Sequence, residues 1–367
     1  MKKFHSPLRR HHLVIIAAIC ASAFSSNAFA LRFPTSHAVT GIAVGDMNGD
    51  GLDDIVTCGN ADGHGSLNVL LGNGDGTFQK ALATRLGPAQ GSLVLGDFNF
   101  DGHLDVATAS SQMGSVRLLL GNGDGTFAVS FVTTLHGVDN AIAAADLNHD
   151  GFLDLVVGQD TQFISLLGDG SGGFGQITYT TVSSPNNGIA LGDIDGDGNI
   201  DVFTGGHICM GKGDGTFVVA PPVFGLIKPY LFDLDNDGQL DLAGILFDST
   251  DNFELFLRRH SSYNEIFDIF NTGLSFHDFA PADINHDGKM DFVLTHDAGD
   301  GIHNYLSTVL STGPLTFQAD NTSFVVGDVI ATGHFNADAE VDIVTGGAPN
   351  FAVYTAYGLG NGQFTNQ

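Results

Sequence analysis

The chain has 367 residues and carries 41 Asp and Glu against 13 Lys and Arg, which gives a formal net charge of −28. This excess of negative charge excludes nucleic acid and anionic membrane surfaces as partners, because both would be repelled. Beyond the first 30 residues there is no apolar run of about 18 residues, the length that a spanning helix requires, so no membrane span is predicted.

The first 30 residues have the pattern of a secretory signal peptide. Residues 1–12 contain four basic side chains, residues 13–24 form an apolar run, and the tripeptide A-F-A ends at Ala30. The sequence therefore predicts a secreted or periplasmic protein whose mature chain, residues 31–367, begins near Leu31. Removal of the four bases changes the charge balance to 9 minus 41, or −32.

The mature chain is organised around a nine-residue acidic loop, D-x-[DN]-x-D-G-x-x-D. The intact copies occupy Asp46–Asp54, Asp97–Asp105, Asp146–Asp154, Asp193–Asp201, Asp233–Asp241 and Asp283–Asp291. A seventh copy, His334–Asp342, lacks the first carboxylate and the glycine. A single copy would usually be a polar surface turn. Six copies that keep every polar position indicate a metal-binding loop instead.

Calcium is the metal that this loop suits. It takes about six to eight oxygen ligands, which a loop supplies from positions 1, 3 and 5, the backbone carbonyl of position 7 and a final carboxylate. The glycine at position 6 allows the sharp turn, and an all-oxygen ligand set argues against zinc or copper. The predicted ligands of about six Ca²⁺ sites are Asp46, Asn48, Asp50, Leu52, Asp54, Asp97, Asn99, Asp101, His103, Asp105, Asp146, Asn148, Asp150, Phe152, Asp154, Asp193, Asp195, Asp197, Asn199, Asp201, Asp233, Asp235, Asp237, Gln239, Asp241, Asp283, Asn285, Asp287, Lys289 and Asp291.

Short apolar, β-branched runs follow every copy of the loop, for example D-I-V-T-C after the first and D-L-V-V-G after the third. Such runs predict strands, whereas an EF-hand would need helices beside its loop. The metal is therefore expected in a β-hairpin. Six Ca²⁺ ions would reduce the charge of −32 to about −20, so we expect folding to be coupled to calcium.

The loops recur at steps of 51, 49, 47, 40, 50 and 51 residues, a period typical of a propeller. A second motif, L-L-G-N-G-D-G-T-F at 119–127, has close or looser copies in four other repeats, and its Asn/Asp-Gly pairs predict hairpin turns. Each repeat then has four strands, the first rich in Ala and Gly and nearest the axis. The phenylalanines after the turn should pack between sheets rather than stack on a cofactor; they are Phe78, Phe127, Phe174, Phe217, Phe317 and Phe364.

The acidic loop, the strand after it and the L-L-G-N-G-D-G-T-F turn resemble the FG-GAP/VCBS repeats of bacterial exported proteins, related to the calcium-binding blades of integrin alpha subunits. The seventh repeat even keeps Gly347-Ala348-Pro349. The resemblance covers residues 33–367 and implies an all-β, seven-bladed β-propeller of four-stranded antiparallel blades with calcium in the first hairpin of a blade. Two departures are the seventh loop, expected to bind no metal, and residues 258–265, which replace the glycine-rich turn.

The two ends of the mature chain predict how the ring closes. The sequence ends at Gln367, only three residues after Phe364, so the last blade lacks most of its outer strand. Residues near 31–38 are expected to supply it, because an unpaired edge is a liability and Pro34 suits an outermost strand. The remaining cysteines, Cys58 and Cys209, lie three repeats apart; they could form a disulfide, but two buried thiols are favoured.

The sequence indicates the function less directly than the fold. Acidic loops and glycine-rich turns should share one rim, and variable segments should form the other: 59–65, 110–114, 159–162, 247–252, 296–301 and the stretches around His136, Pro185 and Lys228. Variable loops on a rigid scaffold are where recognition usually occurs. The favoured hypothesis is a monomeric, non-catalytic binding or adhesion module for an extracellular glycan or protein. The alternative is a secreted carbohydrate-active hydrolase or lyase, although the bases are scattered and no Ser-His-Asp or HExxH spacing is present.

Overall fold

The computed structural model describes residues 10–11, 31–61, 64–87, 91–112, 114–135, 141–183, 188–222, 226–234, 236–247, 253–258, 266–270, 276–297, 304–313, 316–322, 327–347 and 351–365. Several predicted features lie outside these residues: most of the signal peptide 1–30, the ligand Asp235, the loop residues His136 and Pro185, the segment 259–265, and Ala348 with Pro349. The side chain of Phe317 also lies outside the described part.

The described chain is all-β, and its strands form sheets of consecutive antiparallel neighbours. The all-β propeller of four-stranded antiparallel blades is thus confirmed. The first four sheets consist of β3 (Ala38–Gly45), β4 (Asp54–Ala61), β5 (His64–Leu70) and β6 (Leu82–Gly87); β7 (Ser92–Gly96), β8 (Asp105–Ser110), β9 (Ser115–Gly121) and β10 (Phe127–Thr134); β11 (Ile142–Ala145), β12 (Asp154–Gln159), β13 (Gln162–Gly168) and β14 (Phe174–Thr181); and β15 (Ile189–Gly192), β16 (Asp201–Thr204), β17 (His207–Gly211) and β18 (Phe217–Val219).

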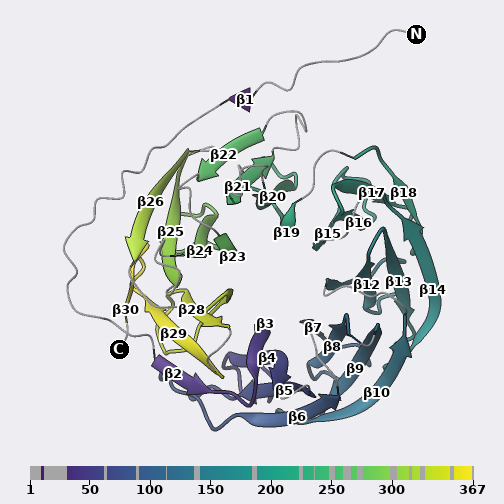
Figure 1. Ribbon diagram of the computed structural model, residues 1–367, viewed down its shortest axis with the longest axis horizontal. Helices are drawn as coiled ribbons and strands as arrows, with labels where there is room; N and C mark the ends of the chain where they lie inside the picture. The colour runs from purple at the N-terminus through teal and green to yellow at the C-terminus, as the bar shows by residue number, and fades with distance from the viewer. Residues whose placement is uncertain are drawn as a thin grey trace.

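Three more sheets follow. They consist of β19 (Ile227–Phe232), β20 (Asp241–Phe247), β21 (Phe253–Arg258) and β22 (Ile266–Phe270); β23 (Phe276–Ala282), β24 (Asp291–Asp297), β25 (Asn304–Gly313) and β26 (Thr316–Thr322); and β27 (Val329–Gly333), β28 (Asp342–Gly346) and β29 (Ala352–Gly358) with β2 (Leu31–Pro34) and β30 (Phe364–Thr365). The short β1 (Arg10–His11) pairs in parallel with β22. Figure 1 shows the sheets arranged around a common centre, with the first strand of each sheet on the inside.

Hydrophobic cores lie between neighbouring sheets. In one of them Phe174 packs against Phe98 from the preceding repeat, with ring centroids 6.2 Å apart. In another, Phe217 packs edge-on against Phe163 at 5.2 Å. The expected packing of the post-turn phenylalanines between sheets is confirmed for the five whose side chains are described, because Phe78, Phe127 and Phe364 belong to three further inter-sheet clusters.

The first and last repeats share a core and an edge. Val39 and Ile55 cluster with Val344 and Val353 from the last repeat. Strand β2 pairs antiparallel with β29, in the register Leu31 to Thr355 and Pro34 to Ala352, while β30 pairs with the end of the same strand. The outer edge of β29 is therefore covered from both ends of the chain.

The two mature cysteines, Cys58 on β4 and Cys209 on β17, are buried and free, so the prediction of two buried thiols is confirmed. Burial raises the pKa of each thiol to about 12, which leaves them inert as nucleophiles at neutral pH. Among the described residues, no helix is long and apolar enough to cross a membrane.

Candidate metal-binding loops

Each acidic loop joins the innermost strand of a sheet to the next strand, and its first carboxylate organises the turn. In the first loop Asp46 Oδ1 accepts the backbone N–H of Gly49 at 2.7 Å and of Asp50 at 3.2 Å, while Oδ2 accepts that of Gly51 at 2.8 Å. Partial burial raises the pKa of Asp46, but these N–H groups outweigh it and hold the pKa below its ordinary value. The carboxylate is thereby kept ionised, as a calcium ligand must be.

The glycine at position 6 has the role predicted for it. In every intact loop its N–H donates to Oδ2 of the position-1 aspartate, at 2.7–2.9 Å. All six glycines have φ between +78° and +90°, a left-handed conformation that disfavours residues with a Cβ. These glycines are Gly51, Gly102, Gly151, Gly198, Gly238 and Gly288.

Positions 3, 5 and 7 gather next to the first carboxylate. In the first loop the Asn48 amide donates to Asp50 Oδ2 at 2.9 Å, and the N–H of Leu52 donates to Asp50 Oδ1 at 2.9 Å. The N–H of position 7 makes the same bond to position 5 in the other five loops, at 2.8–3.0 Å. In the fourth loop one oxygen each of Asp193, Asp195 and Asp197 lies within 4.8 Å of the others. This donor set fits a hard cation.

The aspartate at position 9 does something that the sequence analysis did not foresee. Asp54 is buried, and its two oxygens accept the N–H of Met47 at 2.8 Å and of Gly72 at 2.7 Å. It therefore ties the acidic loop to the end of β5, 18 residues away. Equivalent pairs of bonds are made by Asp105, Asp154, Asp201 and Asp291, and Asp241 accepts the N–H of Leu234.

The seventh loop keeps this pair of hydrogen bonds, here called the brace, although position 1 is a histidine and position 6 an alanine. Asp342 is buried and accepts the N–H of Phe335 at 2.8 Å and of Gly358 at 3.0 Å. Desolvation raises the pKa of Asp342, as it raises that of Asp54 to about 6, although the two N–H groups oppose the shift. The sequence carried one signal of this role: the degenerate copy has lost the aspartate of position 1 but keeps the aspartate of position 9, together with Asp338 at position 5.

Position 1 of the seventh loop is filled by His334, whose Nδ1–H donates to the carbonyl of Glu340 at 2.9 Å. Glu340 occupies position 7, whose carbonyl is the predicted metal ligand in the intact loops. An imidazole N–H thus satisfies the carbonyl that calcium would take, and the carboxylate of position 1 is absent. The donor set of this loop does not fit the ion.

A second feature that the sequence analysis missed is a chain of contacts between successive loops. Position 4 has positive φ in every intact loop, including the non-glycine residues Phe100, His149, Asn236 and His286. His149 donates to Asn199 at 3.0 Å, and His286 to Glu340 at 3.0 Å; both acceptors stand at position 7 of the next loop. Phe100 meets Phe152, also at position 7, with centroids 6.0 Å apart. The loops therefore touch around the rim.

The sixth loop contains a competing cation. Lys289 Nζ lies 2.7 Å from Asp287 Oδ2, where position 5 is expected to bind calcium. The side-chain hydrogen bond from Lys289 lowers the pKa of Asp287. Only the backbone carbonyl of Lys289 is a predicted ligand, so the ammonium would have to move aside for an ion to bind.

The glycine-rich motif is a turn, as predicted. In the first repeat Gly74 and Gly76 have φ of +72° and +84°, and the Asp75 carboxylate accepts the N–H of Thr77 at 2.9 Å. The bond from Gly72 to Asp54 joins this turn to the acidic loop. Both hairpins therefore lie on one rim of the sheet, and the predicted separation of acidic and variable rims is consistent with the topology.

Three histidines contact serine hydroxyls in the described structure. Ser183 Oγ lies 2.7 Å from His207 Nε2, and the Nδ1–H of His207 donates to the carbonyl of Ala220 at 2.8 Å. Similar contacts join His296 to Ser307 and His37 to Ser66 in other sheets. No carboxylate orients His207 among the described residues, and the recurrence of the pair in other sheets indicates a structural contact rather than a catalytic pair.

These observations define a β-propeller whose hairpin loops carry clustered oxygen donors. Four matches to the FG-GAP-like repeat span residues 46–108, 97–157, 146–204 and 233–294, more than half of the chain. The chain belongs to the FG-GAP-like repeat family. No curated protein matches it.

Solved structures share the fold at low identity. A lectin from Agrocybe aegerita, described as recognising non-reducing terminal N-acetylglucosamine, is 17% identical with a TM-score of 0.54, over 79% of this chain and 81% of the other. The exotype rhamnogalacturonan lyase YesX is 14% identical with a TM-score of 0.57, over 90% and 76%. A rhamnogalacturonan lyase from Bacillus licheniformis is 12% identical with a TM-score of 0.53, over 90% and 75%. At these identities the likeness concerns the fold alone.

Proposed function

We propose that this protein is an exported calcium-binding propeller of seven closed blades that acts as a non-catalytic binding module for an extracellular glycan or protein. The observation that carries calcium binding is the repeated loop geometry, in which the position-1 aspartate and the polar side chains of positions 3 and 5 gather around a left-handed glycine. Asp46, Asn48, Asp50, the carbonyl of Leu52 and Asp54 would hold the ion in the first loop, as would their counterparts in the next five.

Calcium would supply rigidity rather than chemistry. It would neutralise carboxylates that repel one another and fix the acidic rim, so that the variable rim presents its loops from a stable scaffold. The pairing of Leu31–Pro34 with β29 supports a ring closed by the N-terminal strand. Export is supported by the leader pattern of residues 1–30.

A glycan array tests the binding function. The chain should retain specific glycans in millimolar calcium and lose them in excess EGTA, because the scaffold loosens without the ions. Protein ligands would be sought in parallel on extracellular extracts with the same two buffers. Hydrolysis or elimination products from the retained glycans would favour the carbohydrate-active enzyme instead. Retention that is identical with and without calcium would contradict the proposed role of the ions.

A further inference from the structure

A cavity of about 660 Å³ lies on the axis of the propeller. All seven inner strands line it, mostly with residues of their first halves, although on β15 and β19 the lining extends to Leu191 and Leu231. The strand ends that lead into the acidic loops do not line it: Gly45, Gly96, Ala145, Gly192, Phe232, Ala282 and Gly333. The cavity is therefore set toward the rim of variable loops, away from the candidate calcium sites.

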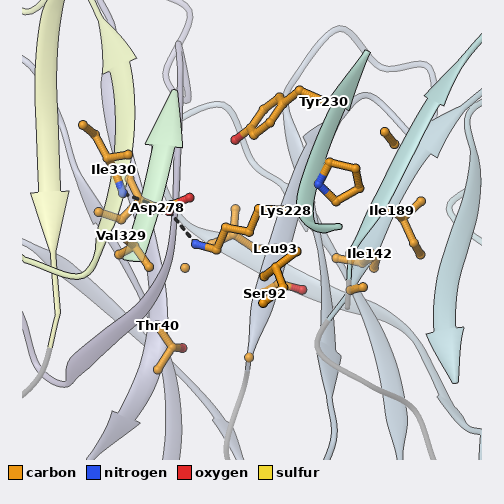
Figure 2. A pocket seen from close by; sticks show the side chains of 18 of the residues that line it. Thr40, Ser92, Leu93, Ile142, Ile189, Lys228, Tyr230, Asp278, Val329 and Ile330 are labelled. Atoms are coloured by element: carbon orange, nitrogen blue, oxygen red, sulfur yellow. Dashed lines mark hydrogen bonds and ion pairs between the residues drawn. The ribbon is translucent and has the colours of Figure 1, made fainter. Parts of the chain in front are cut away.

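The cavity is mainly apolar, with its charges on two adjacent strands. Ile142, Ile189 and Val329 contribute aliphatic wall. Lys228 on β19 reaches across to Asp278 on β23, with 2.5 Å between Nζ and Oδ2, as Figure 2 shows. The inner strands β3, β7, β11, β15 and β27 contain no Asp, Glu, Lys or Arg. The ion pair between Lys228 and Asp278 is therefore not a requirement of the inner strands, since five of them lack charged residues.

The backbone is distorted at both partners. Lys228 has φ of +50°, although a non-glycine residue before proline prefers an extended conformation. The pairing of β19 shifts register between Ile227 and Tyr230, and that of β23 shifts between Phe276 and Asp278. Bulges and left-handed residues of this kind re-aim side chains and occur often beside functional sites.

Asp278 anchors the lysine and has little capacity left for a ligand. Its side chain is 7% exposed, Oδ1 accepts the N–H of Phe279 at 2.9 Å, and Oδ2 accepts that of Ile330 at 3.2 Å as well as the ammonium. The Lys228 side chain is 34% exposed, and its ammonium has three donor hydrogens, of which Asp278 engages one. Lys228 is therefore held in place with donors to spare.

Ser92 supplies a second unsatisfied polar group. Its Oγ is buried from solvent and has no hydrogen-bond partner among the described residues, yet Ser92 lines the same cavity. A buried hydroxyl without a partner costs roughly 1–3 kcal/mol in mutational data. Rotation of the Ser92 side chain about its Cα–Cβ bond would turn the hydroxyl toward the cavity, where a ligand oxygen would relieve that cost.

We propose that the axial cavity binds a neutral, hydroxyl-rich ligand, a sugar unit, through Lys228 and Ser92, with Asp278 as the positioning residue. Sugar hydroxyls can accept from the ammonium and also donate to or accept from Ser92. A second anion is disfavoured beside Asp278 in a chain of net charge −28, and a cation would compete with Lys228. The volume lies within the range of about 300–1,000 Å³ for small-molecule sites. The inference rests on the proposed binding function and names its ligand class.

Titration of the full chain with glucose, galactose, mannose, rhamnose and N-acetylglucosamine, followed by saturation-transfer NMR and calorimetry in calcium, tests the site. At least one neutral sugar should bind, and Ser92→Ala should weaken it several-fold without lowering the melting temperature, because the serine has no partner to lose. Lys228→Met should weaken it at least tenfold. Lys212→Met removes an exposed lysine from the acidic rim and should leave the affinity unchanged.

The controls separate this site from the binding module. If no neutral sugar binds, if glucuronate or phosphate binds instead, or if Ser92→Ala and Lys228→Met leave the affinity unchanged, the axial inference is wrong. Should Lys228→Met fail to fold, Ser92→Ala alone decides. If calcium-dependent binding to the glycan array persists in both variants, the proposed function stands and the axial site is rejected. If the wild-type chain binds nothing on the array, the proposed function itself is rejected.

Discussion

The first and seventh acidic loops show which part of the motif builds the hairpin and which part is suited to a metal. Asp54 and Asp342 are both buried, and each accepts one N–H from its own loop and one from the end of the third strand of its sheet. The loops differ at position 1, where Asp46 accepts several N–H groups and His334 donates to the carbonyl of Glu340. The brace is thus kept where the position-1 carboxylate of the metal donor set is lost.

This difference shows that the nine-residue motif has two separate physical roles, bracing the hairpin and gathering oxygen donors. The aspartate at position 9 satisfies buried backbone donors, a requirement of the fold with or without an ion. The aspartate at position 1 concentrates negative charge in an exposed loop, which is unfavourable unless an ion compensates it. Substitutions at the two positions should therefore respond differently to calcium.

The largest effect is expected from removing calcium altogether. Excess EGTA should lower the melting temperature of the chain by roughly 10 °C or more, because each ion binds the native state and stabilises it by about 2.7 kcal/mol at one hundred times its Kd. Differential scanning calorimetry with and without EGTA measures this, with EGTA plus excess calcium as the control. An unchanged melting curve would show that the loops do not hold stabilising ions.

Asp342→Ala should destabilise the chain by roughly 2–5 kcal/mol in calcium and in EGTA alike, because it leaves the buried N–H groups of Phe335 and Gly358 without their acceptor. Urea unfolding in the two buffers measures the cost. A destabilisation that disappears in EGTA would mean that the seventh loop binds metal after all. The seventh-loop substitution Asp338→Ala, at an exposed motif position, serves as the matched control.

One buried histidine makes a contribution to stability that acid removes and that is independent of the metal. His37 is buried, and its ring accepts or donates to Ser66, Asn68 and Thr57, with Asn68 Nδ2 at 2.6 Å from Nδ1. Burial is the main cause that lowers the pKa of His37 from 6.5 to about 4, so only the unfolded chain binds the proton readily. Stability present above pH 6.5 is therefore lost as the pH falls toward 4, by up to about 3 kcal/mol.

Urea unfolding in EGTA between pH 7 and pH 4 isolates this contribution from calcium release. His37→Gln should make stability fall less, relative to the wild type, as the pH is lowered over that window, whereas substitution of the exposed His64 should leave the slope unchanged. An equal slope in wild type and His37→Gln would remove His37 from the account of acid sensitivity.

The smallest effect concerns the sixth loop. Lys289→Gln removes the ammonium 2.7 Å from Asp287 and should tighten one calcium site roughly threefold, since an exposed ion pair is worth about 0.2–1 kcal/mol. Calorimetric titration of the wild type and the variant would reveal the change. A weaker site in Lys289→Gln would show that the lysine supports the loop instead of competing with its ion.

Local features were predictable from the sequence and distant pairings were not. The loop, its left-handed glycine and the Asn/Asp-Gly turns depend on residues within about ten positions, and Gly51 and Gly74 adopt the conformations expected of them. The brace from Asp54 to Gly72 and the contact from His149 to Asn199 join residues 18 and 50 positions apart. Neither pairing leaves a periodic signal within one repeat.

The ion pair between Lys228 and Asp278 could not be predicted from the sequence for a related reason. Lys228 was noted only as part of a variable stretch, and Asp278 stands in a different repeat with no motif around it. They meet because the fold brings the inner strands to one axis and because both strands carry register shifts there. A register shift that turns a single side chain does not change the hydrophobic periodicity of a strand, so the sequence pattern does not indicate it.

The most direct test of the account is the number of calcium ions that one chain binds. Calorimetry and elemental analysis of the mature chain, residues 31–367, should give six ions, and Asp146→Ala should give five, whereas Asp124→Ala, which removes the same charge from a glycine-rich turn on that rim, should still give six. A stoichiometry near zero would contradict the assignment of the loops to calcium. Seven ions would contradict the distinction between the seventh loop and the others.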